Sequence, residues 1–516
     1  MKPRIRVQFL GGVAYNDNIT GSSFLFTIEQ KKRTFRILFE NGLVQCYKDF
    51  LERNRAILRW LDPSAIDAVV LSHAHIDHSG RLPFLVKNGF RGRIFCTEAT
   101  SLLLPVMLGD SAKVQMTDAL HMRTKNKKKD EVTKDFGRDK LTRGKYDRAM
   151  NKRHHKPKFD PYQPLYGMED VSPTCALVKN DGFPYFEWIR LEKDISLKFY
   201  PSGHVLGGAI CVIKIADPEG DIHLGFSGDL GRFDGIILPP PALIEEPIDY
   251  LWMESTYGGR EHPVREGEIQ KLMDLIKVAV AKKQKILIPS FALERAQELV
   301  YLLSYYMSTR QIPKIPIFLD SPMASKITDV FAKSWELKMF QGQDKLNFNP
   351  FDTRVRSYLK TIQGETDSQA LTTQAGPYIV IAASGMCDAG RIRTHLRAGL
   401  ESPKTVVALV GYMAENSLGR KLKDGLKIVR MNGDELMVRA QIVSFDSFSA
   451  HADGPALVSY TASVMSKNDN PKHKIFLVHG EEKGATALKL DLLHSLPADH
   501  WRENIIIPKL GEEIML

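Results

Sequence analysis

The 516-residue chain has few cysteines and no long apolar run, and both absences narrow what it can be. There are five cysteines, far apart and without a CxxC pair: Cys46, Cys96, Cys175, Cys211 and Cys387. This spacing argues against a disulfide framework and a thiolate zinc site, so any metal would be bound by histidine and carboxylate side chains. No stretch of about 18 apolar residues is present, and the N-terminal sequence reaches a Gly-Gly pair too early for a secretory signal. We therefore expect a cytoplasmic protein that makes no membrane contact.

The excess of positive charge is confined to one segment. The chain has 71 Lys and Arg against 61 Asp and Glu, a net charge of +10. Residues 123–158 contain 15 basic and 5 acidic residues, so this basic segment carries the whole excess. A polyanion such as RNA is a favourable partner for such a segment, because each neutralised phosphate releases counterions. The alternative is a solvated surface insertion, which is what most charge runs are.

The pattern of apolar residues predicts two kinds of domain. The first 120 residues predict mainly short strands, such as FRILFEN and DAVVLSH, with a helix at about 44–60. Farther along, helical segments alternate with apolar strands such as KILIPSF and PYIVIAAS, which is typical of a parallel, doubly wound α/β unit. We predict a β-rich domain at 1–257 that includes the basic segment, an inserted α/β domain at 258–443, and a return to the first domain at 444–516.

The most informative stretch is VVLSHAHIDHSG, where an apolar strand ends and delivers four metal-binding side chains. Within six residues come His73, His75, Asp77 and His78. Side chains alternate along an extended chain, so His73 and His75 point the same way and can reach one cation. Asp77 and His78 continue into the turn and can face a second cation beside it. These ligand types suit Zn²⁺, with Mn²⁺ as an alternative. Two such ions can hold a bridging hydroxide for attack on phosphorus or a carbonyl carbon. The alternative, a polar loop with satisfied histidines, does not account for four ligand types at this spacing.

Two later segments supply further candidate ligands. His204 lies in YPSGHVLGGA and Asp229 lies in FSGDLGR, each at the end of a predicted strand. An aspartate at such a place can bridge two ions with its two oxygens. Taken singly, each residue fits a turn equally well, because glycine-rich turns favour both types.

The ordered motifs HAHIDH, a distant histidine, and an aspartate after Ser-Gly resemble the metallo-β-lactamase fold. The segments MESTYG, IPSFALERAQE, LDSPMA, ASGMCDAGR, SFSAHAD and LVHGE resemble those of the β-CASP nucleases. The bacterial ribonucleases similar to the nuclease subunit of the cleavage and polyadenylation specificity factor are nearest in pattern, and the resemblance covers nearly the whole chain. It implies an α/β protein, a metallo-β-lactamase αββα sandwich with an inserted doubly wound β-CASP domain.

The resemblance also implies a ligand set for two zinc ions. The first ion would be bound by three histidines: His73, His75 and His204. The second would be bound by Asp77, His78 and His479, and Asp229 would bridge the two ions.

By the same resemblance, further residues have roles in phosphodiester hydrolysis. A hydroxide bridging the two ions would attack phosphorus in line with the leaving oxygen, and the carboxylates of Asp77 and Asp229, as metal ligands, count among the catalytic residues. His451 would protonate that oxygen as general acid, and Glu254 would orient the His451 ring through its other nitrogen. A histidine at the place of His479 accompanies RNA processing in this family, so the expected substrate is single-stranded RNA.

The loops of the inserted domain offer candidate phosphate contacts. The amides of Ser384, Gly385 and Met386 follow an apolar strand and precede a helix, a turn that can cradle phosphate oxygens. Arg295 is a further candidate for RNA binding. The alternative is ordinary packing, because strand–turn–helix junctions are common in α/β domains.

One position departs from the family pattern. Where the family usually has an aspartate that orients a metal ligand, this chain has Glu40, in ILFENG. Glutamate is one methylene longer, so keeping the hydrogen bond requires a backbone or rotamer shift. Because losses in such orienting groups reduce metal affinity or activity roughly 10–100-fold, we hypothesise a site that binds metal but is weaker or differently tuned.

The sequence leaves several alternatives open. A small-ester hydrolase has the same fold, although the inserted domain argues against it by burying the metals in a deep cleft. A non-catalytic RNA-binding subunit is the other alternative, and only Glu40 favours it. Endonucleolytic and exonucleolytic cleavage both remain open, as does assembly into a homodimer.

Overall fold

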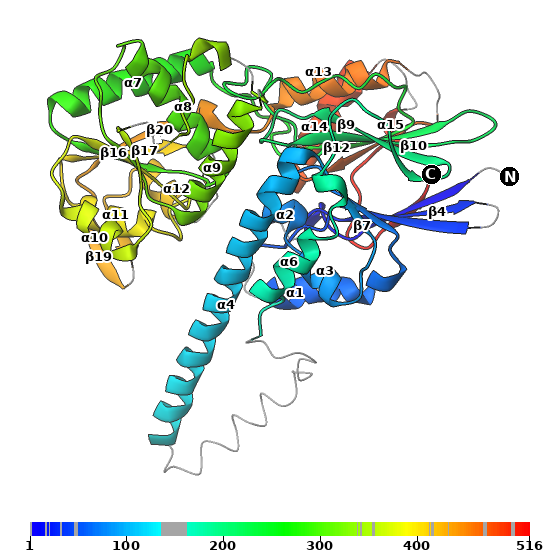
Figure 1. Ribbon diagram of the computed structural model, residues 1–516, viewed down its shortest axis with the longest axis horizontal. Coiled ribbons are helices and arrows are strands. Elements are labelled where there is room, and N and C mark those ends of the chain that lie inside the picture. Colours follow the sequence, from blue (N-terminus) through cyan, green and yellow to red (C-terminus); the bar gives the residue numbers. More distant parts are fainter. Residues whose placement is uncertain are drawn as a thin grey trace.

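The structure is a computed structural model, shown in Figure 1. It describes residues 3–15, 18–19, 21–30, 33–45, 50–135, 163–337, 339–340, 343–352, 357–411, 413, 417–431, 433–467, 472–496 and 501–516. Residues 136–158 of the basic segment lie outside this range. Two bodies stand side by side, and the long helix α4 projects from the first (Figure 1). In the described part of the chain, no helix combines the length and apolarity needed to cross a bilayer.

The first body contains two sheets. One sheet has the order β23 (Glu513–Met515), β1 (Arg4–Phe9), β4 (Phe24–Gln30), β5 (Arg33–Phe39), β6 (Ala68–Val70), β7 (Arg93–Phe95). The other has the order β22 (Ile505–Ile506), β21 (Lys474–Val478), β12 (Tyr250–Glu254), β11 (Ile222–Phe226), β10 (Ala209–Ile215), β9 (Ile195–Pro201), β8 (Ile189–Glu192). Strands from both ends of the chain therefore complete one domain.

Three apolar layers hold the first body together. Phenylalanines of the two inner sheet faces, such as Phe26 and Phe226 with ring centroids 5.3 Å apart, form the core between the sheets. The outer face of the first sheet packs on α1 (Phe50–Ala56), α3 (Leu82–Lys87) and α4 (Glu98–Asp135). The outer face of the second packs on α13 (Gly454–Met465), α14 (Glu482–Ser495) and α15 (Trp501–Asn504). The predicted αββα sandwich is confirmed.

Helix α4 corrects the expectation of mainly short strands before residue 120. It runs for 38 residues from Glu98 and enters the basic segment. Pro105 lies inside it and Gly109 follows one turn later, and both residues weaken a helical signal in the sequence. Its apolar residues do not form a single clear stripe either, since Leu120 is 63% exposed. Tertiary contacts with α6 (Val171–Cys175) and α9 (Pro322–Glu336) support its first part.

The second body is built on one parallel sheet. Its order is β15 (Leu359–Thr361), β14 (Ile317–Leu319), β16 (Tyr378–Ala382), β13 (Lys285–Pro289), β17 (Thr405–Val410), β20 (Gln441–Phe445). Helices α7 (Arg265–Ala281), α8 (Arg295–Ser308) and α9 pack with one face. Helices α11 (Ile392–Gly399) and α12 (Leu418–Lys423) contribute to the core on the other, and α10 (Glu365–Thr373) adds Leu371 there. This is the predicted doubly wound unit. Strand β20 includes residue 443, the predicted end of the inserted domain.

Candidate metal centre and active site

Strand ends from both sheets converge on one edge of the sandwich. His73 and His75 follow β6, and α2 (Ile76–Ser79) carries Asp77 and His78. In the second sheet, β11, β12 and β21 run parallel and side by side, so the residues that follow them gather at one edge. Chain segments more than 400 positions apart are thereby brought together.

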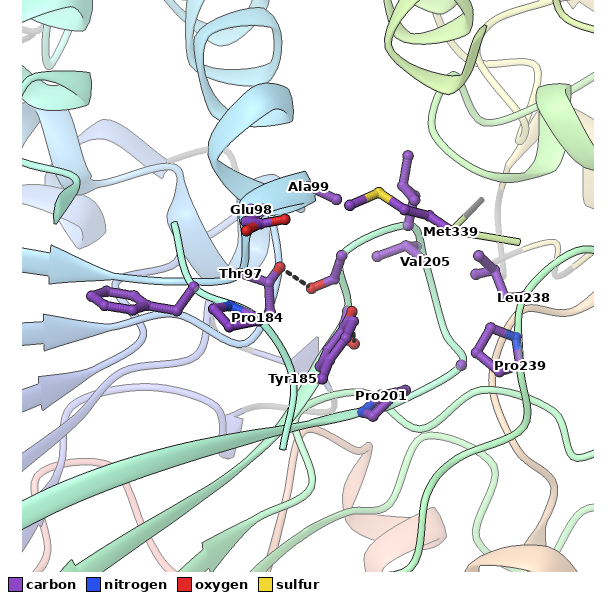
Figure 2. A pocket seen from close by; sticks show the side chains of 15 residues that line it. Thr97, Glu98, Ala99, Pro184, Tyr185, Pro201, Val205, Leu238, Pro239 and Met339 are labelled. Carbon is purple, nitrogen blue, oxygen red and sulfur yellow. Dashed lines mark hydrogen bonds between the residues drawn. The ribbon is translucent and has the colours of Figure 1, made fainter. Parts of the chain in front are cut away.

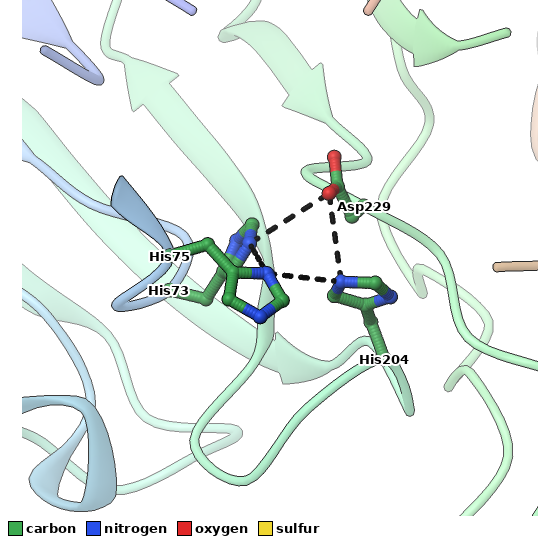
Figure 3. A group of neighbouring side chains, drawn as sticks. All are labelled: His73, His75, His204 and Asp229. Atoms are coloured by element: carbon green, nitrogen blue, oxygen red, sulfur yellow. Dashed lines mark hydrogen bonds and ion pairs between the residues drawn. The ribbon is translucent and has the colours of Figure 1, made fainter. Parts of the chain in front are cut away.

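The first group of side chains has the shape of a ligand shell (Figure 3). His75 Nδ1 lies 3.1 Å from His73 Nε2 and 3.3 Å from His204 Nε2. Asp229 Oδ2 lies 3.7 Å from His73 Nε2 and 3.5 Å from His204 Nε2. Ligand atoms of one tetrahedral Zn²⁺ lie about 3.3–3.4 Å apart, given Zn–N distances of about 2.0–2.1 Å. Four donors from three segments therefore face one point.

The second group lies on the other side of Asp229. His78 Nε2 is 3.2 Å from His479 Nε2 and 3.3 Å from Asp229 Oδ1. Asp77 Oδ2 is 3.6 Å from His479 Nε2. Asp229 thus presents one oxygen to each group, as a bridging carboxylate does.

The donors fit a pair of metal ions. Asp229 Oδ1 is buried without a hydrogen-bond partner among the described residues, although nitrogen atoms surround it. A buried carboxylate oxygen in such a place is costly unless a cation or a proton compensates it. The set contains imidazoles and carboxylates only, which suits Zn²⁺ or Mn²⁺.

The electrostatics of the cluster favour metal binding. Burial, reinforced by neighbouring histidines, lowers the pKa of His73 and of His204 well below the usual value, so both rings are neutral and offer a lone pair. Burial would also lower the pKa of His78, but Asp229 and Glu40 outweigh it and raise that pKa. A proton on His78 therefore competes with a cation, and metal binding must release it.

His451 lies beside the first group and is held by Glu254. Its ring centroid is 4.4 Å from that of His204, and its Nδ1 is 3.2 Å from Glu254 Oε1. Glu254 is fully buried and also accepts hydrogen bonds from the backbone N–H groups of Leu230 and Thr256. Burial lowers the pKa of His451, but the Glu254 carboxylate outweighs it and raises that pKa to about 9. The ring is consequently protonated at neutral pH.

Three supporting residues were not predicted from the sequence. Ser72 Oγ lies 2.8 Å from His73 Nδ1. Thr256 Oγ1 donates to the carbonyl of His479 and lies 3.2 Å from its Nδ1. His262 Nε2 lies 3.1 Å from the carbonyl oxygen of His451. Each stands within or close to a motif already singled out, so proximity to a ligand motif was the available signal.

Glu40 lies behind the second group. Its Oε1 accepts a hydrogen bond from the backbone N–H of Ser72, and its Oε2 is 3.6 Å from His78 Nδ1. The longer side chain therefore faces the ligand that the family's aspartate is expected to orient. Its φ of 62° is rare for a residue other than glycine.

The structure places the candidate phosphate contacts in different surroundings. In the turn after β16, Ser384 uses its amide to donate to Ala389 O, and Met386 O accepts from the amide of Gly419. Arg295 is only 5% exposed and forms an ion pair with Glu298. Arg295 borders a small pocket of about 20 Å³ that His204 also lines, so it lies near the first group, but an RNA contact by its guanidinium would require the ion pair with Glu298 to open.

Comparison with known families agrees with this architecture. A beta-lactamase superfamily domain matches residues 40–133, a Beta-Casp domain matches 296–422, and a Zn-dependent metallo-hydrolase RNA specificity domain matches 435–500. Ribonuclease TTHA0252 of Thermus thermophilus is 32% identical over 476 residues, which cover 91% of this chain and 92% of that protein.

Two further relatives are longer proteins. The transcription termination factor FttA of Methanothermobacter thermautotrophicus is 27% identical over 427 residues, which cover 81% of this chain and 58% of the relative. Cleavage and polyadenylation specificity factor subunit 3-I of Arabidopsis thaliana is 28% identical over 491 residues, which cover 93% and 60%. Fold and site define a metallo-β-lactamase-type hydrolase with an inserted β-CASP domain. The chain belongs to the β-CASP ribonuclease family, as its motifs predicted.

Proposed function

We propose that this protein is a two-zinc ribonuclease that hydrolyses phosphodiester bonds of single-stranded RNA. The observation that carries the proposal is the placement of His451. It stands at the edge of a seven-residue ligand cluster, with one ring nitrogen held by Glu254 and the ring close to His204. A metal cage alone serves many hydrolases, whereas a fixed, protonated histidine beside it suits a reaction with a poor leaving group.

The proposal gives each metal ion its own ligands. His73, His75 and His204 would hold the first, Asp77, His78 and His479 the second, and Asp229 both. Metal ions in such a cage lower the pKa of water and so supply a nucleophile at neutral pH. Zn²⁺ is the proposed metal, with Mn²⁺ as the alternative.

His451 and Glu254 supply the proton for the leaving oxygen. Glu254 holds Nδ1 of the imidazolium, which leaves Nε2–H free to face the substrate. Donation of that proton neutralises the charge that develops on the leaving oxygen. Glu254 accepts three hydrogen bonds in a buried position, so the ring is oriented before substrate arrives.

The direct test is cleavage of internally labelled single-stranded RNA with and without chelator, beside His451→Ala. Chelator-sensitive cleavage that His451→Ala abolishes is the expected result, and product lengths then distinguish endonucleolytic from exonucleolytic action. No cleavage despite two bound zinc ions would contradict the proposal and favour an RNA-binding subunit. Hydrolysis of a small ester without cleavage of RNA would favour a small-ester hydrolase.

Assembly and location remain predictions. The possible homodimer is tested by light scattering of the purified protein, and a cytoplasmic location by cell fractionation. Ser384, Gly385, Met386 and Arg295 remain proposed RNA contacts, to be tested by single alanine substitutions and filter binding.

A further inference from the structure

The loop that carries His204 has a cavity beside it. The cavity has a volume of about 200 Å³ and is bordered by Val205, Leu206 and Gly207 of this loop and by Met339 of the second body. Val205 and Met339 are labelled in Figure 2. His204 itself points to the metal-binding cluster (Figure 3). Val205 and Leu206 are buried in an apolar cluster, and hydrogen bonds to the loop backbone add to this packing.

Two of these hydrogen bonds come from the first body. The hydroxyls of Thr97 and Thr100 both donate to the carbonyl oxygen of Gly207, at 2.6 and 2.9 Å. They hold the far end of the loop, three positions after His204.

A third hydrogen bond crosses between the bodies. Oε2 of Glu294 accepts from the backbone N–H of Leu206, at 3.0 Å. Glu294 belongs to the β-CASP body and immediately precedes α8, whereas Leu206 is two positions from His204. This contact places an acceptor of the inserted domain directly on the segment that carries a metal ligand.

Glu294 occupies its place at a conformational cost. Its φ is 70°, in the left-handed region that favours glycine, and it is only 5% exposed. It does not cap α8, because its side chain makes no capping hydrogen bond. Burial raises the pKa of its carboxyl group to about 8, so it acts mainly as a neutral acceptor near neutral pH. A left-handed backbone conformation at a buried glutamate requires support from its surroundings, and such strained positions cluster at functional sites.

Other contacts between the two bodies surround the hydrogen bond from Leu206 to Glu294. Arg265 of α7 forms an ion pair with Asp234 of the first body, with Nε and Oδ2 3.6 Å apart, and its Nη1 also donates to Glu298 across 3.1 Å. The apolar cluster is continuous between the bodies, because Leu206 belongs to the same cluster as Leu293. A shift of the β-CASP body would therefore move the acceptor of the Leu206 amide.

We propose that Glu294 is a positioning residue, through which the β-CASP body holds the His204 loop and thereby sets the geometry of the first metal site. The proposal rests on the metal-binding role assigned to His204 above. It makes the placement of the two bodies and the affinity for the first metal interdependent. In this proposal Glu294 acts through the loop, by way of the Leu206 amide.

Three substitutions at one position separate the side chain's hydrogen bond from its backbone conformation. Glu294→Gln keeps an acceptor, Glu294→Ala removes it and keeps the strained φ, and Glu294→Gly removes it and relieves the strain. Thr100→Val is the matched control, because it weakens loop support within the first body alone. Hydrogen exchange of a peptide covering residues 203–208 is measured on metal-free protein, and zinc affinity by competition with a chelating dye.

We expect faster exchange in the Ala and Gly variants, with first-site zinc affinity reduced by about 10-fold, the lower end for loss of a supporting contact. The Gln variant should resemble the wild type in both measurements, and Thr100→Val, which keeps the Glu294 contact, should change the exchange of the peptide less than Glu294→Ala does. Wild-type exchange and zinc affinity in Glu294→Gly would overturn the proposal, and so would faster exchange without any change in zinc affinity. Circular dichroism establishes that each variant is folded. Neither measurement uses RNA, so failure of the wild type to cleave RNA would contradict the proposed function without deciding this inference.

Discussion

His451 Nδ1 lies 3.2 Å from Glu254 Oε1, although 197 positions separate the two residues in the chain. The carboxylate reaches this place on β12 of the second sheet, and the histidine follows the last strand of the β-CASP sheet. The segment that carries His451 pairs with Gly231 and Leu230 of the first body, so the contact forms only after the chain has passed through the β-CASP body and returned. Substitution of either residue should therefore affect proton transfer and leave the metal ligands intact.

Replacement of His451 should lower the rate and spare metal binding. His451→Ala and His451→Gln remove the proton donor, and we expect kcat to fall by about 10²–10⁴-fold, the range for a lost general acid. Metal content by mass spectrometry should equal that of the wild type, because His451 is not among the seven ligands. A matching loss of bound metal would contradict the assignment.

The pH dependence of kcat should reflect the interaction of His451 with Glu254. Glu254 raises the pKa of His451 to about 9, and the acid works only when protonated, so kcat should decline as pH rises through about 9. In Glu254→Gln the carboxylate that raises this pKa is absent, and the decline should move to lower pH. An unchanged alkaline limb in Glu254→Gln would show that another group titrates.

Asp229→Asn should release both metals, because Asp229 alone presents an oxygen to each group. A metal bound only to the folded protein stabilises it, so chelator should lower the Tm of the wild type. The Asn variant should start at the lower Tm and respond little to chelator in differential scanning fluorimetry. Release of only one ion would exclude a bridging role.

Metal affinity of the wild type should also rise with pH, because His78 must lose a proton.

Glu40 should tune metal affinity through His78. Glu40→Gln keeps the shape and removes the charge that faces His78 Nδ1 at 3.6 Å, so zinc affinity should fall by roughly 10-fold. Glu40→Asp restores the residue that the family usually has and tests the hypothesis of a differently tuned site. Unchanged metal affinity and rate in Glu40→Asp would remove that hypothesis.

Deletion of residues 123–158 should weaken RNA binding without affecting chemistry. The segment carries the whole positive excess, so its loss should make the plot of log K against log salt less steep. The kcat at saturating RNA should stay within about twofold, because none of the seven ligands is touched. An equal slope before and after deletion, measured by fluorescence anisotropy, would assign the segment to solubility alone.

Local sequence patterns were sufficient for the strands and for the first half of the metal cluster. His73, His75, Asp77 and His78 stand within one short motif, in which alternation puts His73 and His75 on one side and the turn into α2 directs Asp77 and His78 to the second group. The alternation of helices and apolar strands likewise predicts the doubly wound sheet. In both cases the pattern that supports the prediction lies within a short stretch of sequence.

The remaining features depend on tertiary contacts. His451 and His479 join the site only through the parallel packing of distant strands, so a known family pattern was needed to pick them out. Helix α4 escaped prediction because Pro105 weakens its helical signal while contacts with α9 stabilise it. The burial of Arg295 and the reach of Glu294 to Leu206 arise at the interface of two bodies, which no local pattern encodes.

The distribution of the ligands along the chain has a consequence for biosynthesis. His73 emerges from the ribosome early, but His479 follows β21 and emerges only after the whole β-CASP body has been translated. Domains generally fold as units while the chain grows, yet the second metal position here has no complete ligand set until the last strands pair. The nascent chain therefore has no complete hydrolytic centre while the ribosome translates its mRNA. The protein can cleave RNA only after its synthesis ends.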